Sequence, residues 1–186
     1  MRNVLVTGYR AHELNIFDDK HPGIAYIRQA VSTRLIALLE EGLEWMVTPG
    51  QYGVDLWACE AAFELRAEYP QLKVSIIAAC ADQGSNWSET KQAYYRTITD
   101  RVDYYAAVSN QPYQGGWQLA ARDELLLRKT GGIILVYDEE AGEGSPRHIK
   151  NKALRKGARE DYRFMPIRLE DIQLLADEAA WNASQI

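Results

Sequence analysis

The sequence predicts a single α/β domain with a Rossmann-like, doubly wound and mostly parallel sheet. Short apolar runs rich in Val, Ile and Tyr alternate with longer amphipathic runs, and Gly, Pro, Asp or Asn bound most of the short ones. Strict alternation of strands and helices implies right-handed βαβ crossovers and a sheet covered on both faces. The 186 residues, 47% hydrophobic and 25% charged, suffice for one substantial core.

Along the first half of the chain, strands are predicted at residues 4–7, 43–48 and 74–79, with helices between them at 24–41 and 56–69. The strand segments are short and apolar, as buried parallel strands are. The first helix has the clearest pattern, because Ile27, Val31 and Leu35 recur at helical spacing. A βαβαβ unit therefore occupies this half.

Along the second half, helices at 87–102, 118–129 and 147–159 alternate with strands at 104–109, 133–137 and 164–167. Residues 169–186 are predicted to form a terminal helix and a tail, because Glu170 and Asp171 suit a first helical turn. No repeat or low-complexity linker interrupts the chain. One domain is therefore expected to cover residues 1–186.

Composition limits the classes of partner. The net charge of −5 and the pI near 5.3 argue against a general polyanion binder, so nucleic acid is not an expected partner. No apolar run approaches the ~18 residues that cross a bilayer, and no secretory signal precedes the first strand, so a cytoplasmic protein without membrane contact is expected. The helix at 24–41 is long enough to supply a face for a homo-oligomer.

The usual metal and catalytic motifs are missing. Cys59 and Cys80 form no CxxC or Cys/His arrangement and are expected to be buried thiols, and the histidines form no HxxxH or HExxH pair, so no metal site is predicted. Walker A, GxGxxG and GxSxG motifs are also absent. A binding site must therefore come from other loops. In a doubly wound sheet these are the loops at the carboxyl ends of the strands.

Two early loops carry residues suited to a nucleotide. After the first strand, Thr7 offers a hydroxyl, Gly8 permits a tight turn and Arg10 carries a charge suited to phosphate. After the second strand, Gly50 and Gly53 let the backbone approach a ligand, and Asp55 is suited to accept hydrogen bonds from a ribose. The alternative for the first loop is a plain turn with Arg10 on the surface. For the second loop, the alternatives are that the glycines serve the turn alone and that Asp55 satisfies N–H groups at the start of the helix.

Two later segments add candidates. Gly144 and Ser145 form a loop whose N–H groups are suited to phosphate, with Ser145 as N-cap and Pro146 as first helical residue; a cap alone would give the same sequence. Arg122 and the neighbouring Asp123 fit either the site or a solvated helix face. At the edge of the sheet formed by the carboxyl ends of the strands, two aromatic side chains are suited to cover a base. They are Trp87 and Tyr113.

These loops together resemble the SLOG superfamily, which includes the DNA-processing protein Smf/DprA and the cytokinin-activating Lonely Guy enzymes. The segments that carry the resemblance are Thr7-Gly8-Tyr9-Arg10, Gly50-Gln51-Tyr52-Gly53-Val54-Asp55-Leu56-Trp57-Ala58 and Gly144-Ser145-Pro146. The closest likeness is to the YpsA family of small bacterial proteins, over nearly the whole chain. The resemblance implies a Rossmann-like domain and a nucleotide-derived ligand. It also implies binding through Gly8, Arg10, Gly50, Gly53, Asp55, Gly144 and Ser145, and a link to bacterial cell division and stress responses.

The resemblance does not extend to catalysis. Lonely Guy enzymes release a base from a nucleoside monophosphate with an arginine and a glutamate that follows a Gly-Gly-x-Gly-Thr loop. Here Gly144-Ser145-Pro146-Arg147-His148 has no carboxylate in the first turn. The leading hypothesis is a module that senses a nucleotide or ADP-ribose-like ligand and signals to a protein partner.

Two alternatives stay open. One is a nucleotide hydrolase of the phosphoribohydrolase type that uses Asp55, and the other is a scaffold whose glycine loops only make turns. The binding hypothesis predicts that Gly53→Ala or Asp55→Ala abolishes binding and leaves the fold intact.

Overall fold

Six parallel strands form one sheet in the order β4-β3-β2-β1-β5-β6. The computed structural model describes residues 1–186. The strands are β1 (Asn3–Gly8), β2 (Trp45–Thr48), β3 (Lys73–Ala78), β4 (Tyr104–Ala107), β5 (Gly132–Val136) and β6 (Arg163–Ile167). The predicted α/β class with a parallel sheet is confirmed, and each predicted strand is found.

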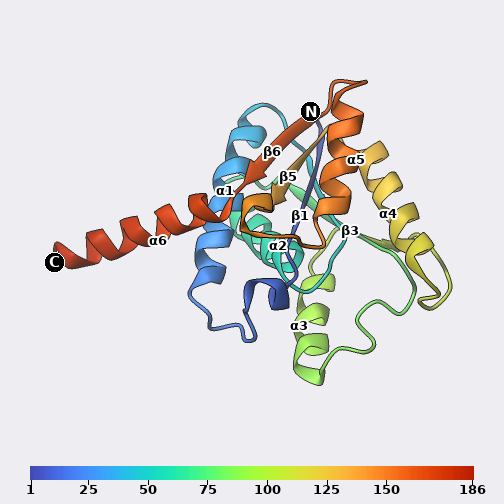
Figure 1. The fold of residues 1–186 in the computed structure, drawn as a ribbon, viewed down its shortest axis with the longest axis horizontal. Coiled ribbons are helices and arrows are strands. Elements are labelled where there is room, and N and C mark those ends of the chain that lie inside the picture. The colour runs from blue at the N-terminus through green and yellow to red at the C-terminus, as the bar shows by residue number, and fades with distance from the viewer.

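Helices alternate with these strands (Figure 1). They are α1 (Gly23–Glu40), α2 (Val54–Leu65), α3 (Glu89–Thr99), α4 (Gly116–Lys129), α5 (Arg147–Gly157) and α6 (Leu169–Ser184), with two short 3-10 helices, η1 (Ala11–Leu14) and η2 (Glu139–Ala141). The first turn of α3 begins after Ser88, whose Oγ accepts a hydrogen bond from the Lys91 N–H, so Trp87 precedes the helix that it was predicted to open.

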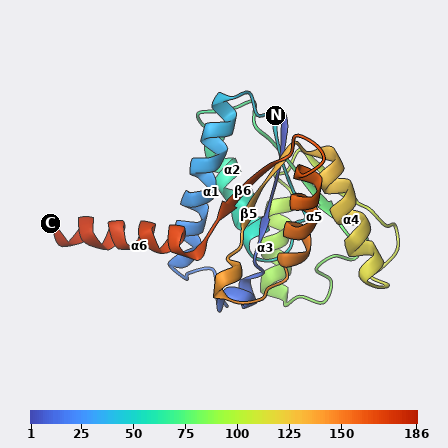
Figure 2. The same ribbon diagram turned by 45° about the horizontal axis from the view of Figure 1, so that its top comes forward.

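The helices form two layers around the sheet. From β1 to β4 the chain moves in one direction across the sheet, so right-handed crossovers put α1, α2 and α3 on one face. It then returns to β5 beside β1, which puts α4 and α5 on the other face, as Figures 1 and 2 show. Both faces of the central strands are covered, and all of β5 is buried.

The strand order reverses between β1 and β5. Gly8, the last residue of β1, pairs with Val136 at the end of β5, so two loops diverge from this point toward opposite halves of the sheet. Such a switch point leaves a crevice at the carboxyl edge, where ligands of doubly wound proteins bind.

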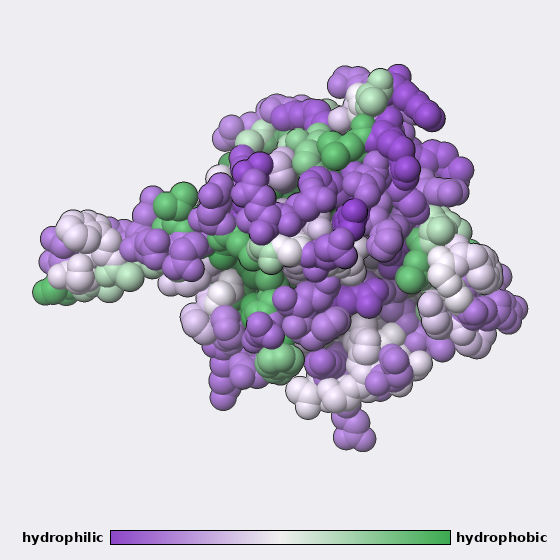
Figure 3. All heavy atoms as spheres, in the orientation of Figure 1, coloured by the Kyte–Doolittle hydropathy of each residue, from purple (hydrophilic) through white to green (hydrophobic).

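The terminal helix α6 packs against α1 near its start and then extends away from the body (Figure 1). Leu174 is 60% exposed and Trp181 is 67% exposed. Apolar residues gather where α6 meets the body, and polar residues cover most of the face in Figure 3. None of the helices has the length and apolar character needed to cross a bilayer. Cys59 and Cys80 are both buried and unpaired, as predicted.

Candidate functional site

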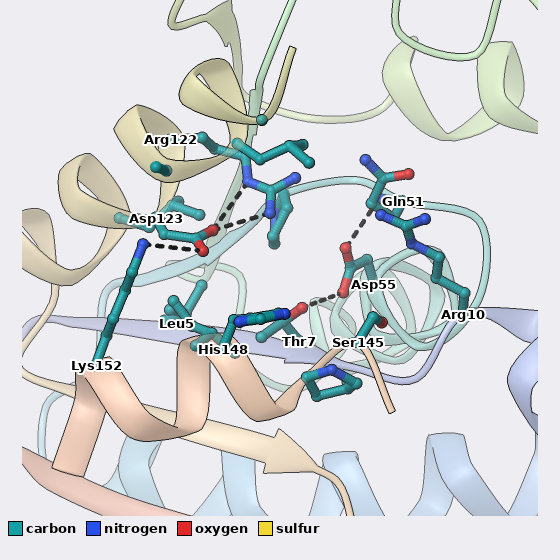
Figure 4. A pocket seen from close by; sticks show the side chains of 18 residues that line it. Leu5, Thr7, Arg10, Gln51, Asp55, Arg122, Asp123, Ser145, His148 and Lys152 are labelled. Carbon is teal, nitrogen blue, oxygen red and sulfur yellow. Dashed lines mark hydrogen bonds and ion pairs between the residues drawn. The ribbon is translucent and has the colours of Figure 1, made fainter. Parts of the chain in front are cut away.

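A cavity of about 390 Å³ lies at the switch point, between the first two loops and the helices α4 and α5 (Figure 4). Of the predicted residues, seven line it: Thr7, Gly8, Arg10, Asp55, Arg122, Asp123 and Ser145. Five predicted residues lie outside its lining: Gly50, Gly53, Trp87, Tyr113 and Gly144. The cavity also receives residues that were not predicted, among them Gln51, His148 and Lys152.

Asp55 ties the first loop to the second. Its Oδ1 accepts a hydrogen bond from Thr7 Oγ1 at 2.7 Å, and its Oδ2 accepts one from the Gln51 N–H at 2.9 Å. The residue is only 2% exposed. Burial raises the pKa of Asp55 to about 6, although the two hydrogen bonds and the charges of Arg122 and Arg10 oppose that rise. The carboxylate therefore fixes the loops that frame the cavity, in addition to any contact with a ligand.

The raised pKa of Asp55 predicts a pH-dependent stability. A buried Asp with a pKa of about 6 binds more protons in the folded state than in the unfolded state between about pH 4 and pH 6. The free energy of unfolding should therefore fall as the pH rises through this window, by no more than about 3 kcal/mol. Asp55→Asn, which keeps an oxygen acceptor, should lack this fall when urea unfolding is measured at several pH values.

Asp19→Asn serves as the control for that comparison, because Asp19 is an exposed carboxylate outside the lining of the cavity. It should keep the slope of the parent protein between pH 4 and pH 6. Parallel stability curves for Asp55→Asn and the parent would show that Asp55 does not titrate in this window.

Gly53 brings the two loops into direct backbone contact. The Ala11 N–H donates to the Tyr52 carbonyl at 3.0 Å, and the Val54 N–H donates to the Tyr9 carbonyl at 3.1 Å. A Cβ on Gly53, whose φ is +142°, would lie 2.6 Å from the Ala11 nitrogen and 2.7 Å from the Tyr9 oxygen. The substituted backbone therefore has to move, and we expect Gly53→Ala to destabilise the fold rather than leave it intact.

Arg122 and Asp123 turn into the cavity rather than toward solvent. Their side chains are 11% and 10% exposed. Asp123 Oδ1 accepts hydrogen bonds from Arg122 Nη2 at 2.9 Å and from Nε at 3.2 Å, while Lys152 Nζ lies 3.6 Å from Oδ2. Arg122 Nη1 is buried without a hydrogen-bond partner. The alternative of a solvated helix face is wrong for this pair, which Figure 4 shows facing the cavity.

Glu13 holds Ser145 in place. Glu13 Oε2 accepts a hydrogen bond from the Ser145 N–H at 2.8 Å, and its Oε1 accepts from Ser145 Oγ at 2.6 Å and from the Arg10 N–H at 2.9 Å. Burial raises the pKa of Glu13, but these hydrogen bonds outweigh it and hold the pKa below its ordinary value. Pro146 is the N-cap of α5 and has no side-chain cap, so the prediction of Ser145 as N-cap is wrong by one residue.

Glu13 is not among the residues predicted from the sequence. Its one local signal is the spacing of Arg10 and Glu13, because an acidic side chain three residues after the N-cap can accept from the N-cap N–H, as Glu13 Oε1 does from the Arg10 N–H. That signal explains one hydrogen bond of the carboxylate. The contact with Ser145, 132 residues away, leaves no trace in the spacing.

A second cavity of about 430 Å³ adjoins the first and shares Arg10, Gln51 and Leu119 with it. Trp87 and Tyr113 line this second cavity. The Trp87 ring meets the Tyr95 ring edge-on at 5.2 Å and the Tyr52 ring at 6.0 Å, while Tyr113 is 57% exposed. The Tyr113 N–H donates to Asp82 Oδ1 at 2.9 Å, which joins the loops after β3 and β4. The two predicted aromatic residues thus lie at one cavity.

Comparison with known proteins identifies relatives over almost the whole chain. A family model described as YpsA, the YspA SLOG family, matches residues 4–172. A UPF0398 protein of Brevibacillus brevis is 44% identical, with 96% of this chain and 94% of the relative aligned. UPF0398 proteins of Lysinibacillus sphaericus (41%; 94% and 97% aligned) and Bacillus cereus (36%; 100% of both chains) are also similar.

Among solved structures, DNA processing protein A from Helicobacter pylori, which binds single-stranded DNA, is similar with a TM-score of 0.48 and 16% identity. The likeness covers 97% of this chain and 81% of that one. A likeness of this degree supports no inference about a ligand.

Proposed function

The chain belongs to the YpsA SLOG family, and from this we propose that its cleft binds a nucleotide or nucleotide-derived ligand through phosphate and that a protein partner reads the bound state. The observation that carries the proposal is the buried Nη1 of Arg122, which has no partner in the protein. A buried donor on a charged group is costly when unsatisfied. An anionic oxygen in the cavity would satisfy it.

The charges around Arg122 favour the same ligand. Asp123 orients the guanidinium through Nε and Nη2, which leaves Nη1 available for a further bond. Arg10 lines the same cavity and makes no ion pair, and Lys152 contributes a third cation. The first turn of α5 contains no acidic residue. Together these groups are suited to phosphate oxygens.

The adjoining cavity supports a nucleotide rather than a free phosphate. Arg10 and Gln51 line both cavities, so a ligand can extend from the cationic side to the aromatic side without leaving the cleft. Trp87 and Tyr113 offer rings for a base. Asp55, which a ribose hydroxyl would approach, lies in the cationic cavity.

A second candidate is hydrolysis of the bound nucleotide by Asp55. Burial raises the pKa of this carboxyl to about 6, which is the range of a general base. Against it, Thr7 and the Gln51 N–H already bond both oxygens, and no carboxylate follows the Ser145 loop. Binding is therefore the function that the geometry favours.

The test is thermal denaturation of the protein with adenine and guanine nucleotides, NAD and ADP-ribose, followed by product analysis of each ligand that raises the Tm. A ligand present at 100 times its Kd should add about 2.7 kcal/mol, a rise of several degrees. A rise with unchanged ligand supports sensing, and a released base or phosphate supports hydrolysis. No rise with any of these ligands would contradict the proposal.

A further inference from the structure

We infer that Ser145 and the N–H of Arg10 form a phosphate subsite that the carboxylate of Glu13 occupies until a ligand phosphate displaces it. The inference rests on the proposed function and adds a position for one phosphate and a competitor for that position. Three donors from two loops converge on this one carboxylate: the Arg10 N–H, the Ser145 N–H and the Ser145 hydroxyl. Backbone N–H groups and a hydroxyl at the start of a helix are the donors that phosphate-binding loops use.

Gly144 leaves the space that the carboxylate fills. A Cβ on Gly144 would lie 3.0 Å from the Tyr9 ring and 3.2 Å from Glu13 Oε2. Any larger residue would therefore press on the acceptor itself. The glycine therefore leaves room for the Glu13 carboxylate between the loop after β1 and the loop after β5.

The subsite opens toward the cationic cavity. Ser145 and Arg10 both line that cavity, and Figure 4 shows Arg10, Asp55 and Ser145 along one side of it. A phosphate at Ser145 would accept from the donors that Glu13 now holds and would also face the guanidinium of Arg10, which lines the same cavity. A phosphate carries more negative charge than a carboxylate and more acceptor oxygens, so it is the stronger partner for this donor set.

Displacement has a structural consequence. Glu13 is the residue through which η1 is fastened to the Ser145 loop, and η1 is followed by Asn15, the only non-glycine residue with a positive φ (55°). Phe17, two residues further, is 70% exposed. Release of Glu13 would loosen η1 and the segment that presents Phe17. Ligand binding would thereby change a surface that a partner can read.

The experiment measures pyrophosphate binding by calorimetry to the full chain and to Glu13→Gln. Gln has the size of Glu but no charge, and its amide nitrogen cannot accept from Ser145. We expect Glu13→Gln to bind pyrophosphate roughly tenfold more tightly than the parent protein, because the internal competitor is lost. Glu140→Gln, an exposed residue of the nearby η2, makes the same change in net charge and should bind as the parent does.

A second measurement needs no substitution. In ¹H–¹⁵N spectra of the parent protein, pyrophosphate should shift the Ser145 and Arg10 amide signals, and amide exchange of residues 11–17 should become faster. Equal or weaker binding by Glu13→Gln, or unchanged Ser145 and Arg10 signals at saturation, would overturn the inference. Nucleotide binding by the parent in the thermal assay would then still support the proposed function. Failure in that assay as well would overturn both.

Discussion

We expect Gly53→Ala to lower the free energy of unfolding by about 4 kcal/mol, since the substitution combines a forbidden backbone conformation with a steric clash. The φ of Gly53 is +142°, and its Cβ would meet the backbone of the first loop at Ala11 and Tyr9 within 2.7 Å. Neither contact can be relieved by turning a side chain. Urea denaturation followed by tryptophan fluorescence measures the loss.

Gly42→Ala is the matched control, because Gly42 also has a positive φ (+96°) but nothing lies within 4 Å of its Cβ. It should lose only the cost of the left-handed conformation, about 1 kcal/mol. Equal losses in the two variants would mean that the close approach of the loops contributes nothing to stability. Weak ligand binding by Gly53→Ala would in that case report on the site alone, as the sequence had suggested.

The fold was predictable because local periodicity and connectivity agree. Residues 133–137 are apolar throughout, as a strand buried on both faces must be, and the structure places β5 next to β1 at the centre of the sheet. Each strand is followed by a helix, which allows only parallel neighbours and right-handed crossovers. Observed and predicted helix boundaries differ where a local cap fixes the first turn. Ser88 is the N-cap of α3, so the helix begins two residues later than predicted.

The loops that form the cavity were predictable from the same topology. Residues that follow parallel strands share one edge, so Thr7, Asp55 and Ser145 come together although they lie far apart in the sequence. Their role in binding stays a prediction. The contact of Glu13 with Ser145 was not predictable, because no periodic pattern encodes which carboxylate meets which loop.

The charge pattern left open whether Arg122 faces the site or solvent, but the spacing of residues in its helix indicates the answer. Gln118, Arg122 and Leu126 are spaced by four residues and so share one face of α4. Gln118 is fully buried and Leu126 is 1% exposed. Polar residues on the buried face of a helix indicate a polar site rather than a solvated surface. The charges of Arg122 and Asp123 considered alone suggested a solvated helix face, because the positions of the apolar residues on the helix were not considered with them.

Arg122→Gln is expected to weaken binding of the nucleotide identified in the thermal assay by roughly 100- to 1,000-fold, the cost of removing one partner of a desolvated charge pair. Arg122 Nη1 is the buried donor that awaits an acceptor, and Asp123 fixes its direction. Arg122→Lys keeps the charge beside Asp123 but loses the planar fork, so an intermediate loss of roughly tenfold is expected. Calorimetric titration of each variant gives the Kd values.

Arg128→Gln is the control for the charge removed, since Arg128 lies on the same helix, makes no ion pair and lies outside the switch-point cavity. It should bind the nucleotide with the affinity of the parent protein. If Arg122→Gln did the same, the buried guanidinium would serve only to neutralise Asp123 and Nη1 would not face the ligand. If Arg122→Gln and Arg128→Gln lowered the nucleotide affinity equally, the phosphate would be held by the overall positive electrostatic potential around α4 rather than by a direct contact. The Kd would then depend steeply on the salt concentration. A large loss in Arg122→Gln with none in Arg128→Gln requires the ligand at Nη1 itself.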